Sequence, residues 1–278
     1  MKCANCGTPT PWSSTGRCAG CSWYTPYAIT DKRPEYRDPG RLATFAVAML
    51  AVALLADAFY VVASARMVSM AGDLLVGSPD VTNTRIESVF NMRTLALRVH
   101  YGSLIAAAVP FVVWFRRARL NAEVFAPTAM RTNSGMAIGA WIIPIANLWM
   151  GRKIANDIDR AVLVPVPEGP QVGRRAAGRT GPARALLNIW WALWIGSIWG
   201  GLGYSLVGEP IAIMTADDAD SFSLDQLHGE ALGDVVSNSI GVLAAVAAIL
   251  VVRRITALQR ARATTFLVFP AREGQPVV

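Results

Sequence analysis

Four cysteines near the start of the chain have the spacing of a metal site. They form two Cys-x2-Cys pairs, made by Cys3, Cys6, Cys18 and Cys21. A Cys-x2-Cys turn points two thiolates at one metal ion, and two such turns complete a tetrahedron around Zn²⁺. Two disulfides or four free thiols are the alternatives. Because four thiolates leave no open position on the metal, the spacing predicts a zinc ribbon over residues 1–26 whose Zn²⁺ is structural.

A second group of chemically active residues lies inside apolar stretches. Asp57 interrupts one apolar run, and Arg98 and His100 stand near the start of another. A charged carboxylate at the centre of a membrane helix costs about 2.5–3.5 kcal/mol on insertion scales. We therefore expect Asp57 to face other helices and to contact Arg98 or His100. Such a contact is either structural or part of a transport or proton-relay path.

The elements that position these residues are predicted to be membrane-spanning helices. Of the 278 residues 53% are hydrophobic and 16% are charged, with a mean hydropathy of +0.37. Soluble domains carry about a quarter charged residues, so this composition argues against a soluble enzyme, a disordered chain or a secreted disulfide scaffold. A bilayer crossing needs about 20 apolar residues. The stretches of that length are 42–64, 95–115, 185–207 and 234–252.

The charges between these spans predict how the chain is threaded. Most Lys and Arg residues, 22 of 26, fall in four segments: 1–41, 116–134, 151–184 and 253–278. Loop 208–233 has none and carries six acidic residues. Cytoplasmic loops collect Lys and Arg. We therefore expect a multi-pass protein of the cell membrane, embedded in the lipid bilayer, with four spans and both termini in the cytoplasm.

A shorter apolar stretch, Gly135 to Met150, contains Pro144 and Asn147. Its 16 residues are few for a span, and a fifth span would export the basic segment that follows it. The sequence therefore predicts a short Pro-containing half-membrane helix, within a half-membrane or interfacial element over 135–163. A fifth helix kinked at Pro144 is the alternative. Asn147 either caps the kink or lines a substrate site. Trp141 and Trp149, eight residues apart, are expected on similar faces at the membrane interface.

The amphipathic helix after Met150 carries two aspartates, Asp157 and Asp159. They are metal-ligand types, but the adjacent Lys153 and Arg160 favour a solvated face of the helix.

The rest of the chain divides into linkers and one helix-packing motif. Gly196-x3-Gly200 lets another helix approach closely, and we expect the span 234–252 to be its partner; dimerisation, giving a homo-oligomer, is the alternative. The connecting segments are a linker over 27–41, a basic linker rich in Pro and Gly over 164–184, and a flexible tail over 263–278.

One sequence block resembles a known family. The block runs Trp141-Ile-Ile-Pro144-Ile-Ala-Asn147-Leu148-Trp149, and an arginine-rich block from Trp114 to Glu123 precedes it. Together they resemble the domain of unknown function 4328 family, which comprises bacterial, mainly actinobacterial, multi-pass membrane proteins that often carry an N-terminal cysteine-rich ribbon. The likeness covers roughly residues 42–262, and it implies that this range forms one membrane domain. The family has no established activity, so the resemblance implies architecture only.

Sequence motifs of catalysis are absent. The chain has two histidines and no zincin, nucleophile-elbow or phosphate-loop pattern, so we expect no enzyme. The first hypothesis is a membrane-anchored regulatory or interaction protein whose cytoplasmic ribbon binds a protein partner. The alternative is a small transporter or channel-like protein that uses Asp57 and Asn147. The remaining hypotheses are a membrane enzyme and a ribbon that binds nucleic acid. No nucleic acid is expected, because the basic linker can bind anionic lipid headgroups instead.

Overall fold

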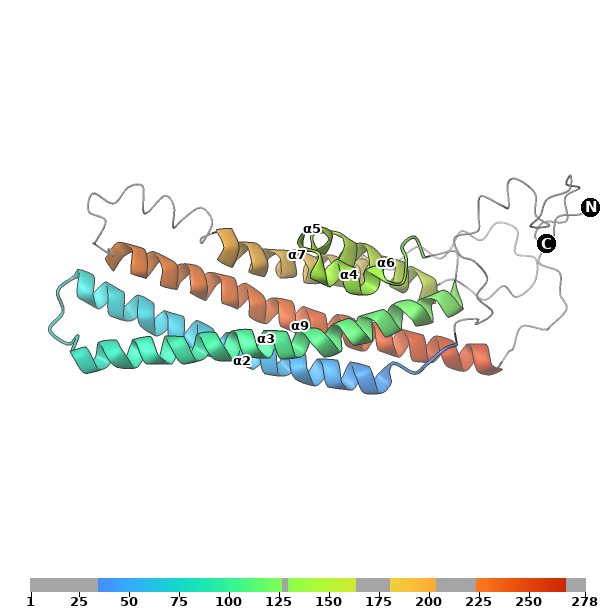
Figure 1. The fold of residues 1–278 in the computed structure, drawn as a ribbon, viewed down its shortest axis with the longest axis horizontal. Coiled ribbons are helices and arrows are strands. Elements are labelled where there is room, and N and C mark those ends of the chain that lie inside the picture. Colours follow the sequence, from blue (N-terminus) through green and yellow to red (C-terminus); the bar gives the residue numbers. More distant parts are fainter. Residues whose placement is uncertain (1–34, 127–129, 164–180, 204–223, 269–278) are drawn as a thin grey trace, which may run out of the picture.

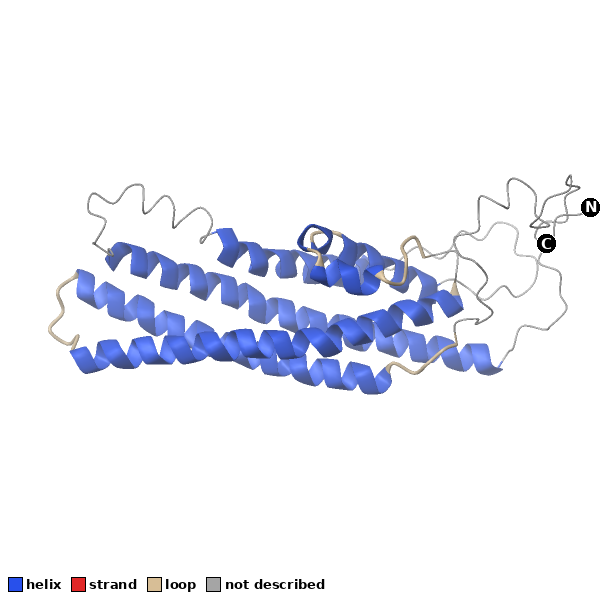
Figure 2. Cartoon of the chain, viewed as in Figure 1, coloured by secondary structure: helices blue, strands red, loops and turns tan. Residues whose placement is uncertain are grey.

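The computed structural model describes residues 35–126, 130–163, 181–203 and 224–268, and every element among them is a helix (Figure 2). The predicted all-α class is therefore confirmed for these residues. The predicted zinc ribbon, with its four cysteines, lies outside the described residues, as does most of the basic linker. The helices are α2 (Gly40–Leu75), α3 (Asn83–Phe125), α4 (Met136–Ile142), α5 (Pro144–Asn147), α6 (Met150–Leu163), α7 (Gly181–Gly203) and α9 (Leu224–Val268).

Three of the described helices, α2, α3 and α9, are long and apolar enough to cross a membrane. The remaining predicted span, 185–207, begins within α7, and its residues 204–207 lie outside the described chain. The number of spans therefore stays a prediction. The long helices exceed the predicted spans: α2 has 36 residues, or about 54 Å at 1.5 Å per residue, against a hydrocarbon core of about 30 Å.

The long helices lie side by side, with α2 antiparallel to both α3 and α9 (Figure 1). At one end of the bundle, called here the hairpin end, residues 76–82 join α2 to α3. At the opposite end, called here the basic end, α2 begins and α3 and α9 finish. Arginines gather toward this end of both helices: Arg116, Arg117 and Arg119 of α3 and Arg253, Arg254, Arg260 and Arg262 of α9.

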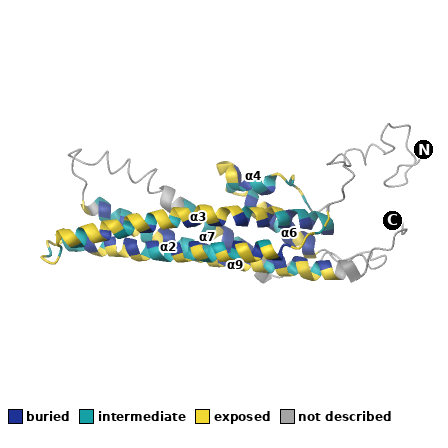
Figure 3. Cartoon of the chain, turned by 60° about the horizontal axis from the view of Figure 1, so that its bottom comes forward, coloured by how far each residue is buried: buried dark blue, intermediate teal, exposed yellow. Residues whose placement is uncertain are grey.

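Small residues let the helices approach one another closely. Ala43, Ala46, Ala53, Ala56 and Ala63 of α2 recur at helical spacing, and all five are buried. Helices without a hydrophobic driving force between them associate through such small-residue faces. Figure 3 shows the resulting pattern, with buried residues between the helices and exposed residues on the outside of the bundle.

α7 packs against α9, the partner expected for the Gly196 face, while dimerisation stays untested. A Cβ added to Gly196 would stand 3.5 Å from Ile240 Cγ2, and Ser237 Oγ donates a 3.0 Å hydrogen bond to the Ser197 carbonyl oxygen.

The turn between α2 and α3 sets the register of these two helices. Gly77 adopts a positive φ of 67°, and Ser78 N–H donates to the Asp73 carbonyl oxygen at 2.9 Å, as in a Schellman motif. Thr82 then caps α3 by accepting a hydrogen bond from the Arg85 N–H. Because the turn is short, residues equally far from it lie at the same height. Asp57 lies 18 residues before the end of α2, and His100 lies 17 residues after the start of α3.

The stretch predicted as a half-membrane element is broken into two short helices. Ile143, which precedes Pro144, has extended dihedral angles (φ −84°, ψ 113°) and separates α4 from α5. A residue before proline is pushed out of the helical region. The seven residues of α4 reach about 10 Å, so neither piece can cross a bilayer by itself. Whether the element enters the membrane stays a prediction.

The start predicted for the flexible tail, residue 263, is too early, because α9 continues to Val268. Ala263 is buried in a small cluster with Phe125 and Val162. Contacts with α3 and α6 therefore extend the helix beyond its apolar stretch.

Candidate functional site

A cavity of about 510 Å³ lies inside the bundle, with walls from α2, α3, α7 and α9 and a contribution from the α4–α5 segment. It brings together three of the residues that the sequence singles out, namely Asp57, His100 and Asn147. Its walls are mostly apolar and rich in rings, contributed by Tyr60, Tyr101, Phe111, Trp141, Trp190 and Trp194. An apolar pocket of this size with a few converging polar groups is typical of a small-molecule site.

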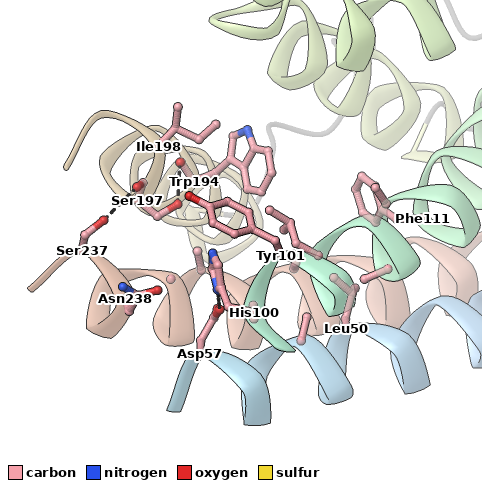
Figure 4. A pocket seen from close by; sticks show the side chains of 18 of the residues that line it. Leu50, Asp57, His100, Tyr101, Phe111, Trp194, Ser197, Ile198, Ser237 and Asn238 are labelled. Carbon is pink, nitrogen blue, oxygen red and sulfur yellow. Dashed lines mark hydrogen bonds and ion pairs between the residues drawn. The ribbon is translucent and has the colours of Figure 1, made fainter. Parts of the chain in front are cut away.

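Asp57 and His100 form a close pair in this cavity (Figure 4). Asp57 Oδ1 lies 2.6 Å from His100 Nδ1, and the two side chains are only 13% and 18% exposed. A carboxylate can only accept a hydrogen bond, so Nδ1 carries the proton that is shared with Asp57. A Cβ added to Gly241 would stand 3.1 Å from Asp57 Oδ2, which shows how closely α9 covers this carboxylate.

Arg98, the other partner expected for Asp57, does not reach it. Arg98 is exposed, whereas His100 faces the bundle. Residues two positions apart point to different sides of a helix, so only one of the two can face Asp57.

A second ion pair, not predicted from the sequence, lies beside the first. Arg93 Nη2 lies 2.6 Å from Asp234 Oδ2, and the Tyr60 hydroxyl donates a 3.0 Å hydrogen bond to the same oxygen. Asp234 is the first residue of its predicted span, and Arg93 lies just before another. The pair could have been predicted from these positions, because Arg93 and Asp234 carry opposite charges at the same predicted depth in the membrane.

Asn147 connects the α4–α5 segment to α7. Its Oδ1 accepts a hydrogen bond from Trp194 Nε1 at 3.3 Å, and the carbonyl oxygen of neighbouring Leu148 accepts one from Trp191 Nε1 at 3.2 Å. The amide thus closes one wall of the cavity and also holds the broken helix in place.

Trp141 and Trp149 do not share a face, contrary to expectation. Trp141 lies in an aromatic cluster, with ring centroids 5.0 Å from Phe111 and 5.4 Å from Phe115. Trp149 is 52% exposed. The prediction assumed one continuous helix, and the break at Ile143 removes the periodicity on which it rested.

The expectation of a solvated aspartate face on α6 is wrong. Asp157 and Asp159 are only 2% and 1% exposed. Asp159 Oδ1 binds Arg254 Nη1 at 2.9 Å. Asp157 Oδ1 is 3.9 Å from the exposed Arg131 Nε, which is too long for a hydrogen bond, and burial raises the pKa of Asp157. Helix α6 buries both aspartates, and Arg254 of α9 pairs with Asp159. The spacing of residues within α6 does not predict this distant partner.

Further buried polar side chains join α3 to α9 near the basic end. Trp114 Nε1 donates to Thr256 Oγ1 at 3.0 Å, and Gln259 Nε2 donates to the Ala118 carbonyl oxygen at 2.8 Å. Asn121 exchanges hydrogen bonds with the backbone of Arg37, at 2.9 and 3.2 Å. The segment before α2 is therefore fastened to the bundle.

The same segment is fastened to α9 by Asp38. Its carboxylate binds Arg260 through two hydrogen bonds of 2.8 Å, and these hold the pKa of Asp38 below its ordinary value.

The described residues offer no metal site of their own. Within residues 35–126, 130–163, 181–203 and 224–268, no group of three or more His, Cys, Asp or Glu side chains is placed to hold a metal ion.

Comparison with known proteins agrees with the sequence block around Trp141. A family model described as "Domain of unknown function (DUF4328)" matches residues 79–257, which include α3 to α7 and most of α9. No curated protein matches the chain, and no solved structure matches it.

Proposed function

The chain belongs to the DUF4328 family, and from this premise we propose that it is a multi-pass membrane protein that binds a small ligand inside its helix bundle. The observation that carries the proposal is the cavity in which Asp57 and His100 meet. Ionisable residues within membrane helices mark substrate, ion or proton paths. The proposal therefore places the chain with carriers and ligand-gated membrane proteins.

A purely structural role for the Asp57–His100 pair fits the surroundings less well. A pair that only joined α2 to α3 would be expected to have other side chains packed around it. This pair instead lines a cavity of about 510 Å³, together with the hydroxyl and amide side chains of Tyr60, Ser237 and Asn238.

Filling the cavity tests the proposal whatever the identity of the ligand. Ala245 lines the cavity, whereas its neighbour Val246 is exposed on the same helix. We expect the full chain, purified from its native membranes in mild detergent, to retain a bound small molecule that native mass spectrometry detects. Ala245→Phe should lose this species, and Val246→Phe should keep it.

Both variants should elute as monodisperse protein, which separates loss of ligand from loss of fold. Retention of the same species by Ala245→Phe, or the absence of any bound molecule on the wild type, would contradict the proposal.

The threading of the chain is a further part of the proposal. We infer that the basic end lies in the cytoplasm, because arginines crowd it while acidic residues dominate loop 208–233. Trypsin added outside spheroplasts should then spare the basic linker 164–184, and cleavage there would reverse the orientation.

We also propose that a cytoplasmic zinc ribbon binds a protein partner, and that this binding depends on the conformation of the helix bundle. The support is the spacing of the four cysteines and the attachment of Arg37 and Asp38, which follow the ribbon in the chain, to α3 and α9.

The ribbon has its own test. We expect elemental analysis to find about one Zn²⁺ per chain, as four thiolates complete one tetrahedral site. The double variant Cys3→Ser/Cys6→Ser should lose the zinc while the bundle stays folded. Full zinc content in the variant would place the metal elsewhere.

A further inference from the structure

The cavity has one polar end. The side chains that meet there are Asp57, Tyr60, His100, Asp234 and Asn238. Arg93 compensates the charge of Asp234 at 2.6 Å, while among the described residues the close partner of Asp57 is an imidazole. When that imidazole is neutral, the polar end keeps one uncompensated negative charge, which favours a cation.

The other end of the cavity is apolar, and the whole is elongated along the helices. Its lining on α2 runs from Tyr60 to Leu50, which is about 15 Å at 1.5 Å per residue. On α9 the lining runs from Asp234 to Ala248, about 21 Å by the same rise. The apolar end is formed by Leu50, Phe111, Val112, Trp190 and Ala248. A polar end joined to an elongated apolar end matches the shape of an amphiphile.

His100 offers a hydrogen-bond acceptor to a ligand. Its Nδ1 is bound to Asp57, and its Nε2 has no hydrogen-bond partner among the described residues. In Figure 4 the ring of His100 stands between Asp57 and the side chains of Tyr101 and Trp194. A carboxylate that holds the Nδ1 proton leaves Nε2 as the acceptor of the neutral ring. A ligand N–H donor, such as that of an ammonium group, matches this acceptor, and aromatic faces nearby also attract a cation.

The cavity reaches the surface of the bundle on its lipid-facing side. Tyr101 and Leu104 line it, and they are 56% and 39% exposed. Their neighbours on the outer face of α3, Ile105 and Val109, are exposed apolar side chains. On the far side of the opening, α7 packs mainly against α9 and α6. A ligand dissolved in the lipid can therefore reach the cavity between α3 and α7 without passing through water.

We propose that the ligand is a single-chain amphiphile with a primary ammonium headgroup, and that it enters sideways from the lipid between α3 and α7. The headgroup donates to His100 Nε2 beside Asp57, and the tail lies along the apolar end. This inference rests on the proposed function and specifies its ligand class. A fatty acid of the same length is excluded because its carboxylate would meet Asp57 at the polar end.

Binding of radiolabelled dodecylamine to the full chain in phosphatidylcholine nanodiscs tests the inference. Dodecylamine that partitions into the lipid is measured in nanodiscs carrying Ala245→Phe, and this background is subtracted from the other measurements. We expect saturable binding to the wild type and to Val246→Phe, and none of dodecanoate. Short-chain butylamine should bind at least tenfold more weakly, because it cannot fill the apolar end.

Two residue variants test whether the headgroup contacts His100. His100→Asn keeps a donor to Asp57 in the position of Nδ1 but removes the acceptor Nε2. It should weaken dodecylamine binding about tenfold or more without lowering thermal stability, the loss expected for one hydrogen bond to a charged group. Arg98→Gln, on the exposed side of α3, should leave binding unchanged.

The outcomes separate this inference from the proposed function. Equal binding of dodecanoate, or unchanged binding by His100→Asn, would overturn the ammonium assignment, and equal binding of butylamine would overturn the tail. If no dodecylamine binds while Ala245→Phe still loses the co-purifying molecule, the inference fails and the proposed function stands. If neither effect is seen, both fail.

Discussion

Asp159→Asn is expected to destabilise the protein by about 3 kcal/mol, the loss typical of removing one partner from a buried ion pair. Asp159 is 1% exposed, and its Oδ1 binds Arg254 Nη1 at 2.9 Å. The substitution leaves the Arg254 guanidinium without its counter-charge. In a chain of this size the apparent Tm, followed by thermal unfolding in detergent, should fall by roughly 6 °C or more.

Asp157→Asn, two residues away, is expected to have the opposite sign. The carboxylate of Asp157 accepts a hydrogen bond from the Arg131 backbone N–H, but the Arg131 side chain is 3.9 Å from Oδ1, and Oδ2 has no hydrogen-bond partner among the described residues. A buried, poorly paired carboxylate opposes folding, and its removal should raise the apparent Tm by about 2 °C. If both substitutions lowered the Tm equally, the assignment of a paired and a poorly paired aspartate would be wrong.

The effect of Asp157 should also depend on pH. Burial raises the pKa of Asp157 above its ordinary value of about 3.9, so the folded state binds this proton more tightly than the unfolded state does. The stability that protonated Asp157 contributes is therefore fully present below about pH 4, and it is lost as the pH rises through the raised pKa of the folded state. The Tm difference between Asp157→Asn and the wild type should be largest at neutral pH and should vanish near pH 4.

A double variant provides the control for the Asp159 prediction. Replacing both partners, as in Asp159→Leu/Arg254→Met, removes the pair without leaving a charge behind. Buried pairs replaced by apolar residues of similar volume are often neutral in stability. Most of the lost Tm should return, and failure to recover it would show that Asp159 acts through some other contact.

Trp141→Ala is expected to cost about 3 kcal/mol, the lower end of the range for truncating a large core aromatic residue, because Trp141 is half-buried against the core. The Trp141 ring stands edge-on to Phe111 and Phe115, and its centroid lies 6.0 Å from that of Trp194. It also lines the cavity, so the variant should lose the molecule that the wild type binds.

Trp149→Ala is the matched control for Trp141. The two tryptophans belong to the same sequence block, but Trp149 is 52% exposed. Exposed positions usually change stability by less than about 0.5 kcal/mol, so the Tm in detergent should stay nearly constant. An equal loss of Tm for both variants would mean that the block acts as one structural unit and that the separation of the two rings has no energetic consequence.

Much of the helical architecture was predictable from the sequence. Long apolar runs identify α2, α3 and α9, and the spacing of Ile154, Ile158, Ala161 and Val162 identifies α6, because burial of one helical face leaves a period of 3.6 residues. The helix ends were less predictable. Ala263 continues α9 because Phe125 and Val162 cover it, and those contacts come from distant parts of the chain.

The candidate site was predictable only in part. The cost of a carboxylate within an apolar run indicated that Asp57 needs a partner, and His100 at similar depth was one of two candidates. The choice between His100 and Arg98 depends on the rotation of α3 about its axis. That rotation is set by packing of its whole buried face against α2, which local sequence does not record.

The amino-acid sequence by itself determined which segments are apolar helices and where charge accumulates, since both follow from composition and local periodicity. Only the tertiary structure decided which polar groups meet. The short turn around Gly77 brings Asp57 level with His100, and the break at Ile143 turns Trp141 inward while Trp149 stays exposed. Inward burial of Asp157 and Asp159 was also a tertiary outcome, because an arginine 95 residues further along the chain faces Asp159. Contacts between residues so far apart depend on how the helices pack, and packing is a property of the whole chain.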